Sequence, residues 1–185
     1  GVYPSISQDA AFEDENIDYL VIGEGEERLP NLIRAIHAAD GLQSVDGIMY
    51  RENGKVINNP QKSIGIEDLD TLPYPDYSDF DMEKLMNWGA KYTQNFQFRQ
   101  FPVGIMMTSR GCPYRCTYCA AGKDLNPIND RKNVRTRSPE NILGEIDYLR
   151  AEYGMRELIM VDDSLLLPSD RAIGFMKGMV KRREQ

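Results

Sequence analysis

The sequence has few thiol or imidazole side chains, which are the ligands of iron–sulfur clusters and most zinc sites, and few cysteines that could form a cross-link. It contains three cysteines, one histidine and one tryptophan among 185 residues. A disulfide would leave one cysteine without a partner, and structural zinc usually needs four Cys or His ligands. His37, expected to be structural, lies far from the cysteines in the sequence. Disulfide, zinc and inert thiols therefore remain only as alternatives to another kind of metal site.

Long apolar runs and a strong positive charge are also lacking. No stretch of about 18 apolar residues occurs, so a membrane partner is not expected. The formal net charge is −7, and the acidic excess lies in residues 1–100. Because that region lacks a basic stripe, nucleic acid is not expected as a partner there.

All three cysteines lie in the short segment Cys-Pro-Tyr-Arg-Cys-Thr-Tyr-Cys, with the spacing C-x3-C-x2-C at Cys112, Cys116 and Cys119. Thiolates are soft ligands that suit iron–sulfur clusters and zinc. A cubane cluster held by only three thiolates keeps one iron open, where a substrate can bind. The spacing therefore predicts a metal site with these three cysteines as ligands.

Residues 108–119 resemble the signature loop of the radical S-adenosylmethionine (SAM) superfamily, including an aromatic residue, Tyr118, before the last cysteine. The resemblance implies a [4Fe-4S] cluster on the three cysteines, with SAM chelating the open iron and Tyr118 near the adenine. It also implies that one electron from the cluster cleaves SAM to methionine and a 5′-deoxyadenosyl radical. A reductant such as flavodoxin or ferredoxin is then an expected partner.

The sequence around the loop predicts alternating strands and helices. Residues 101–108 and 158–161 are short apolar runs typical of buried parallel strands. The Ser-Pro pair at 138–139 predicts a helix start, Gly154 its end, and Ser169 the region where a second helix begins. This βαβα order predicts parallel strands with functional residues at their carboxyl ends.

Polar residues at these strand and helix ends are candidate SAM ligands. Asp162 and Asp163 follow the second strand, and the resemblance implies that one contacts the SAM amino group, although the superfamily commonly has Gly-Gly-Glu there. Alternatively, the two aspartates cap the following turn. Arg135 and Arg137 are candidates for a bidentate contact with the SAM carboxylate. The other basic residues around the loop are expected on a solvated face; they are Arg110, Arg115, Lys123, Arg131 and Lys132.

Residues 1–100 contain a second possible ligand site. Residues 18–22 predict a strand, followed by Gly-Glu-Gly-Glu-Glu and a helical pattern, and glycines at such a junction suit a nucleotide or phosphate. An Asn53-Gly54 pair predicts a hairpin turn. The succession resembles the stretch between the cobalamin-binding domain and the barrel of cobalamin-dependent radical SAM enzymes. The resemblance implies that Gly23 and Gly25 help to receive the nucleotide tail of cobalamin.

The expected fold is therefore α/β. Residues 1–45 would form the C-terminal part of a Rossmann-like cobalamin-binding domain, residues 46–100 a linker with a small hairpin, and residues 101–185 the first βα units of a partial TIM-like radical SAM barrel. Two βα units are too few for a complete barrel, so we expect an internal fragment of a larger protein. Such a fragment should bind cobalamin weakly or not at all, because little of the cofactor would be buried.

Three functions remain open. The first is a cytoplasmic radical SAM enzyme that uses the cluster and cobalamin for methyl transfer, or for radical cyclisation or rearrangement, on a small molecule. The second is a methylthiotransferase of the same superfamily, which carries further cysteines in an N-terminal domain, whereas residues 1–100 have none. The third is a non-catalytic iron–sulfur or zinc-binding module. The aromatic stretch 88–101 either lines a substrate approach or packs a linker onto a domain.

Overall fold

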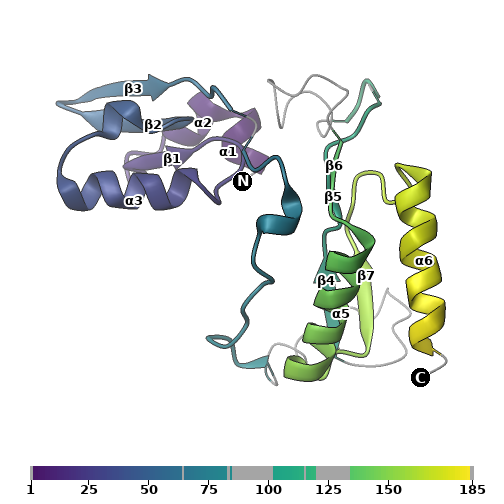
Figure 1. The fold of residues 1–185 in the computed structure, drawn as a ribbon. Helices are drawn as coiled ribbons and strands as arrows, with labels where there is room; N and C mark the ends of the chain where they lie inside the picture. Colours follow the sequence, from purple (N-terminus) through teal and green to yellow (C-terminus); the bar gives the residue numbers. More distant parts are fainter. Residues whose placement is uncertain are drawn as a thin grey trace. The chain divides into compact units, whose positions relative to one another are not determined.

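The computed structural model describes residues 2–63, 65–82, 84, 102–114, 116–119 and 134–183. They fall into two compact units, one drawn from residues 1–67 and 111–134 and the other from residues 68–110 and 135–185 (Figure 1). Each unit has its own buried core. None of the helices within these ranges is long and apolar enough to span a membrane.

The first unit is built on a three-stranded antiparallel sheet, in which β2 (Ile48–Glu52) lies between β1 (Tyr19–Val21) and β3 (Lys55–Asn59). The hairpin turn predicted between β2 and β3 is confirmed, because Asn53 and Gly54 both have positive φ angles, 51° and 75°, as a tight hairpin requires. The sequence did not predict that β1 would pair with β2. The domain boundaries after residues 45 and 100 stay predictions.

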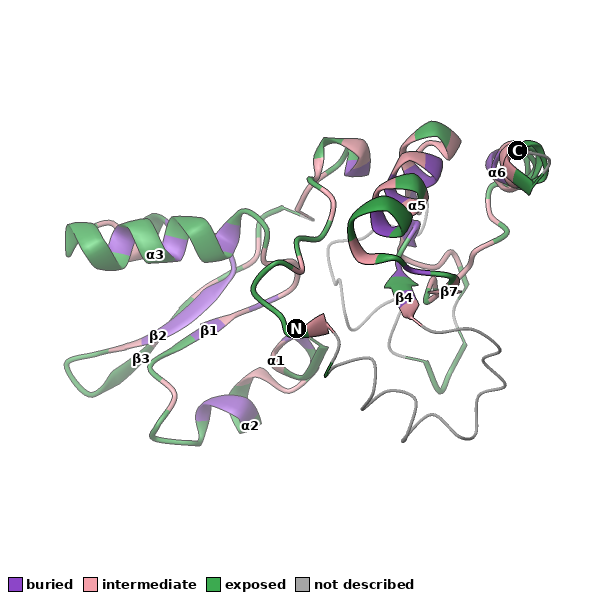
Figure 2. Cartoon of the chain, turned by 90° about the horizontal axis from the view of Figure 1, so that it is seen from below, coloured by how far each residue is buried: buried purple, intermediate pink, exposed green. Residues whose placement is uncertain are grey.

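Short helices cover one face of this sheet. α1 (Val2–Ile6) and α2 (Gln8–Phe12) lie on the side where the Phe12 ring packs with Leu20 of β1 and Met49 of β2 (Figure 2). These three side chains are buried. Their burial holds the N-terminal helices against the sheet.

The other face of the sheet is covered by α3 (Arg28–Ala38), whose Leu32 packs with Ile48 of β2. Neighbouring side chains of a strand point to opposite faces, so Ile48 and Met49 enter different cores. A short 3-10 turn at Leu42–Ser44 leads from α3 toward β2. The glycine-containing loop between β1 and α3 is thereby fixed at both ends.

The second unit confirms the predicted βαβα order. β4 (Val103–Met106) pairs in parallel with β7 (Glu157–Met160), α5 (Pro139–Tyr153) lies between them in the sequence, and α6 (Ser169–Arg183) follows. The predicted start and end of the first helix are also confirmed. Ser138 caps α5 by accepting a hydrogen bond from the Asn141 N–H at 3.1 Å, and Gly154 ends it with a φ of 64°.

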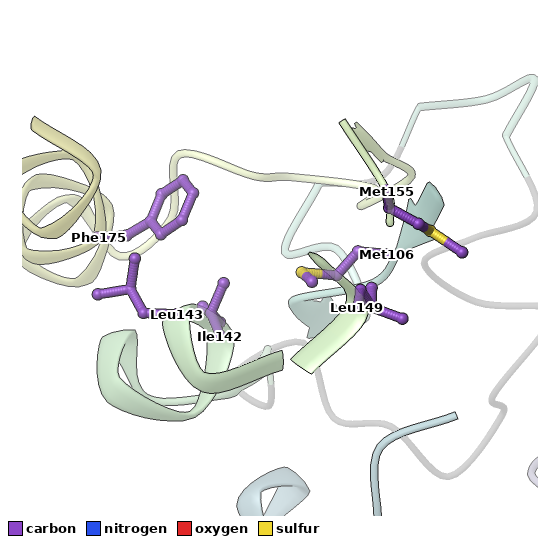
Figure 3. Packing of buried hydrophobic residues seen from close by; sticks show 6 residues of the cluster. All are labelled: Met106, Ile142, Leu143, Leu149, Met155 and Phe175. Carbon is purple, nitrogen blue, oxygen red and sulfur yellow. The ribbon is translucent and has the colours of Figure 1, made fainter. Parts of the chain in front are cut away.

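The core of the second unit is formed between α5, α6 and the two parallel strands. Figure 3 shows its six buried side chains, which are Met106, Ile142, Leu143, Leu149, Met155 and Phe175. The two helices approach closely at Gly178, where an added Cβ would lie 2.2 Å from a methyl carbon of Leu143. This packing fixes the position at which α6 begins, next to the carboxyl end of β7.

A segment without regular structure runs along α5 after a 3-10 turn at Leu69–Thr71. Asp70 accepts a hydrogen bond from the Ser138 N–H at 2.8 Å, and the Tyr74 hydroxyl donates to the Asn141 carbonyl at 3.1 Å. The Tyr74 hydroxyl oxygen would lie 2.5 Å from a Cβ at Gly144, so the glycine leaves room for it. These contacts fix the N-terminal end of α5.

Candidate functional site

The carboxyl ends of β4 and β7 are joined through Asp162. Its Oδ1 accepts hydrogen bonds from the Thr108 N–H at 3.0 Å, from the Thr108 hydroxyl at 2.8 Å and from the Ser109 hydroxyl at 2.5 Å. Thr108 and Ser109 are buried. Oδ2 of Asp162 is also buried and has no hydrogen-bond partner among the described residues. Asp163 is exposed.

Arg171, in the first turn of α6, completes this group of buried polar residues. Its Nη1 donates to the Thr108 hydroxyl at 2.8 Å and to the Thr108 carbonyl at 3.2 Å, while Nη2 donates to the carbonyls of Leu165 and Leu167 at 2.6 and 3.2 Å. Burial lowers the pKa of Arg171 from its ordinary value, and the Asp162 carboxylate acts in the opposite direction. The two charges therefore compensate each other across Thr108.

The two arginines predicted to bind a carboxylate lie near the start of α5. Arg135 is buried in β6 (Arg135–Thr136), which pairs antiparallel with β5 (Ser109–Arg110). Arg137 donates from Nε to Asn141 Oδ1 at 2.6 Å and from Nη1 to the Met107 carbonyl at 3.2 Å.

Arg137 is also held by an ion pair with Glu145, a residue of α5 that is only 2% exposed. Its guanidinium lies over the Tyr74 ring at 5.7 Å from the ring centre. The N–H donors of Arg137 are therefore largely engaged by partners within the second unit. The carboxylate role of Arg135 and Arg137 stays a prediction.

A cavity of about 300 Å³ lies beside the Arg137–Glu145 pair. Most of its lining is apolar and comes from β4, the residue after β7 and the segment along α5. The apolar residues include Ile105, Met107 and Val161. Such a lining suits the apolar part of a small molecule, and Arg110 also lines the cavity.

The three cysteines are free thiols in this structure. Cys112 is half-buried, Cys116 and Cys119 are exposed, and the Cys119 N–H donates to the Cys116 carbonyl at 3.1 Å. Tyr118 is 90% exposed. Within the described ranges, no three His, Cys, Asp or Glu side chains are gathered closely enough to hold a metal ion.

The chemistry of this donor set nevertheless fits an iron–sulfur cluster. Three unpaired thiols in one short loop can each supply a soft thiolate ligand. Metal sites commonly assemble only when the metal binds, because binding is coupled to the folding of the ligand loop. The assignment of Cys112, Cys116 and Cys119 as ligands stays a prediction.

The glycine-containing loop of the first unit is held by a buried arginine. Arg28 donates from Nε and Nη2 to Asp46 Oδ2 at 3.2 and 2.8 Å, from Nη1 to the Glu24 carbonyl at 3.0 Å, and from Nη2 to the Ser63 carbonyl at 2.6 Å. Burial alone would raise the pKa of Asp46, but hydrogen bonds from Arg28, the Lys62 N–H and Ser63 lower it on balance.

Gly23 and Gly25 differ in what surrounds them. Gly23 has a φ of 74°, and its N–H donates to Ser5 Oγ at 2.8 Å. A Cβ at Gly25 would meet no atom within 4 Å. The space beside the Gly25 Cα is thus open, although its carbonyl accepts from the Leu29 N–H at 2.8 Å, while the Gly23 N–H is engaged with α1. The cobalamin role of both glycines stays a prediction.

Sequence patterns missed Thr108, Arg171 and Arg28, because each acts through partners distant in the sequence. The only local signal was the position of Arg28, in the first turn of a predicted helix and directly after the polar loop at residues 23–27. Among the earlier predictions, the stretch 88–101 and four basic residues lie outside the described residues. These four are Arg115, Lys123, Arg131 and Lys132. His37 is exposed on α3, away from the cores.

Comparison with known proteins gives a family match and relatives along most of the chain. Residues 106–178 match the family model "Radical SAM superfamily". An uncharacterized methyltransferase, PH0819, from Pyrococcus horikoshii is 34% identical over 157 residues, which are 85% of this chain and 30% of that protein. The anaerobic magnesium-protoporphyrin IX monomethyl ester cyclase of Cereibacter sphaeroides is 27% identical over 173 residues, 90% of this chain and 25% of the cyclase.

A solved structure resembles the fold. OxsB, a cobalamin-dependent S-adenosylmethionine radical enzyme with aqua-cobalamin and S-adenosylmethionine bound, matches with a TM-score of 0.69 and 28% identity over 98% of this chain and 24% of OxsB. The chain thus spans between a quarter and a third of the length of the two curated relatives above. The match supports a mixed α/β fold of the kind found in such enzymes.

Proposed function

We propose, from the premise that this chain belongs to the radical SAM enzymes, that Cys112, Cys116 and Cys119 hold a [4Fe-4S] cluster that binds S-adenosylmethionine. One observation carries the proposal: three free thiols lie in one short loop that comes after β4 and β5, inside the segment that matches the family model. When bound, the cluster and S-adenosylmethionine supply a 5′-deoxyadenosyl radical. The protein binds, orients and shields these groups.

The strand ends and the cysteine loop offer groups for each part of S-adenosylmethionine. An aspartate at the end of β7, Asp162 or Asp163, supplies a negative charge for the ammonium group. Arg135 or Arg137 supplies a cation for the carboxylate, for which a guanidinium is suited. The exposed ring or backbone of Tyr118 is free to contact the adenine.

Cobalamin is the second proposed cofactor. The open space at Gly25 fits the close backbone approach of a nucleotide tail, and OxsB, which resembles this chain in fold, has aqua-cobalamin bound. We assign residues 1–45 to the end of a Rossmann-like cobalamin-binding domain and residues 101–185 to the start of a TIM-like barrel. Residues 46–100 are assigned to the linker, and the antiparallel pairing of β1 with β2 joins the first segment to this linker.

The proposed reaction is methyl transfer to a small molecule, or a radical cyclisation or rearrangement of one. The relatives reported above include a methyltransferase and a cyclase, so both reaction classes occur among proteins similar to this chain. A protein reductant of the flavodoxin or ferredoxin type would deliver electrons. Since thiols and a low-potential cluster must stay reduced, we place the protein in the cytoplasm.

Anaerobic reconstitution tests the proposal. We expect the chain to take up iron and sulfide in the ratio of one [4Fe-4S] cluster, and each Cys→Ala variant to lose the cluster, because two thiolates cannot hold a cubane stably. Thr117→Ala, in the same loop, is the matched control and should keep full iron content. A single Cys→Ala variant with the parent's iron and sulfide content would refute the assignment.

A second measurement addresses catalysis. After reduction with dithionite, the reconstituted chain should convert S-adenosylmethionine to 5′-deoxyadenosine and methionine, and the Cys→Ala variants should not. Full cluster content without either product, in the presence of the reductant, would count against the radical function and favour a non-catalytic iron–sulfur module.

A further inference from the structure

We infer that Thr108, Asp162 and Arg171 form a positioning node that fixes the end of β4 where the chain enters the cysteine loop. The inference rests on the proposed function, because that loop would hold the cluster. Only three residues separate Thr108 from Cys112 along the chain, so the direction in which the chain leaves Thr108 limits where the first ligand can lie. Asp162 then acts through Thr108, and Asp163 is the strand-end aspartate open to a ligand.

Every polar atom of Thr108 is engaged in this node. Its N–H and hydroxyl donate to Asp162 Oδ1 at 3.0 and 2.8 Å, and the hydroxyl accepts from Arg171 Nη1 at 2.8 Å. Its carbonyl accepts from Arg171 Nη1 at 3.2 Å and from the Arg137 N–H at 2.9 Å. The residue is 0% exposed. Thr108 is thus fully satisfied at the centre of the network, while Asp162 Oδ2 and Arg171 Nε are buried without a hydrogen-bond partner among the described residues. The hydrogen bonds of Thr108 restrict how the backbone can move at this point.

Arg171 extends the node to the connection between β7 and α6. Its Nη2 binds the Leu165 and Leu167 carbonyls, while Nη1 binds Thr108. A single planar guanidinium therefore connects α6 with Thr108 and with the chain at residues 165–167. The ammonium group of lysine cannot reproduce this arrangement of hydrogen bonds. Because the charges of Asp162 and Arg171 compensate each other, loss of Asp162 would leave the buried Arg171 guanidinium without compensation, and loss of Arg171 would leave the half-buried Asp162 without its cation.

The environment of Asp162 argues against a direct contact with a ligand. Oδ1 already accepts three hydrogen bonds, and Oδ2 is buried. A ligand ammonium group could reach Oδ2 only if the surrounding residues moved. Asp163, by contrast, is exposed at the same strand end.

Two variants of Thr108 test the node itself without any cofactor. Thr108→Val keeps the shape of the side chain but removes the hydroxyl, whereas Thr108→Ser keeps the hydroxyl. In the cluster-free chain, amide hydrogen exchange of residues 103–110 should become about thirtyfold faster in Thr108→Val, the factor for two lost hydrogen bonds of about 1 kcal/mol each. Thr108→Ser should exchange at nearly the parent's rate.

Arg182→Met is the matched control, because Arg182 lies on α6 like Arg171 but forms its ion pair with Asp147 at the surface. It should leave exchange in residues 103–110 unchanged. If Thr108→Val does not fold, Asp162→Asn takes its place, since it keeps the acceptor oxygen but removes the charge. Unchanged exchange in both Thr108→Val and Asp162→Asn, or in the one of them that folds, would overturn the inference.

Spectroscopy of the reconstituted protein separates positioning from a purely structural role. Thr108→Val should keep the parent's iron content but bind S-adenosylmethionine about tenfold more weakly and alter the EPR signal of the cluster with S-adenosylmethionine, because a misplaced loop misplaces the ligand. If Thr108→Val instead loses iron and folded structure to the same extent, Thr108 has a structural role only. If Asp162→Asn weakens binding while its exchange is unchanged, Asp162 is a ligand and the inference is wrong.

The same set of variants distinguishes the two hypotheses. Should the parent chain take up no cluster, the proposed function fails, while the exchange measurements still decide whether the node exists. Asp163→Asn adds a further test of the assignment. It should weaken binding of S-adenosylmethionine without changing exchange in residues 103–110, and unaltered binding would contradict the role given to Asp163.

Discussion

Replacing Arg28 should destabilise the first unit more than any change at its surface. The Arg28 side chain is 3% exposed, and its ion pair with Asp46 at 2.8 Å is joined by hydrogen bonds to two backbone carbonyls. One guanidinium thus connects the glycine-containing loop, the start of α3 and the segment after β3. Methionine has a similar length but can donate none of these hydrogen bonds.

The magnitude follows from the burial of the two partners. Removing one member of a buried ion pair costs about 3–5 kcal/mol, because the other charge remains without compensation. The Asp46 side chain is 26% exposed and keeps its hydrogen bonds from the Lys62 N–H and Ser63 hydroxyl. We therefore expect Arg28→Met to cost about 3 kcal/mol, the lower end of that range.

The loss should be measured in the first unit alone, because two units need not unfold together. Native-state hydrogen exchange of the β2 amides reports the opening free energy of this sheet. The control is Arg34→Met, since Arg34 lies on the same helix but is exposed and bonds only Asn31 among the described residues. It should cost under about 0.5 kcal/mol. Equal losses in the two variants would refute the argument from burial.

Three further predictions concern single positions. The pKa of Asp46 is lower in the folded state than its ordinary value, so the stability that this carboxylate contributes should be present at neutral pH and be lost as pH falls below about 4. Asp46→Asn should therefore make the free energy of unfolding of the first unit less dependent on pH in acid. Gly178→Ala should destabilise the second unit by about 1–3 kcal/mol, because the new methyl group meets Leu143, and a melting temperature equal to the parent's would contradict the close helix contact. Ser138→Ala should cost about 1 kcal/mol through loss of the cap on Asn141, measured by urea unfolding, while Ser138→Asp should restore most of it.

Local signals in the sequence identified much of the second unit. The cap at Ser138, the stop at Gly154 and the hairpin turn at Asn53 depend on residues within a few positions of each other, so they could be predicted without knowledge of the fold. The parallel pairing of β4 and β7 followed from the βαβα order. The cysteine spacing likewise identified the family to which residues 106–178 match.

Contacts between distant residues were decided only by the tertiary structure. Arg28 and Asp46 are 18 residues apart, Thr108 and Asp162 are 54 apart, and Thr108 and Arg171 are 63 apart. Composition and periodicity show which residues are polar, but not which buried charge will meet which partner. The sequence by itself therefore determined the family that residues 106–178 match and the order of strands and helices in the second unit. Folding decided that Asp162 ties two strand ends together, because a buried carboxylate must find its hydrogen-bond donors wherever the packed chain places them.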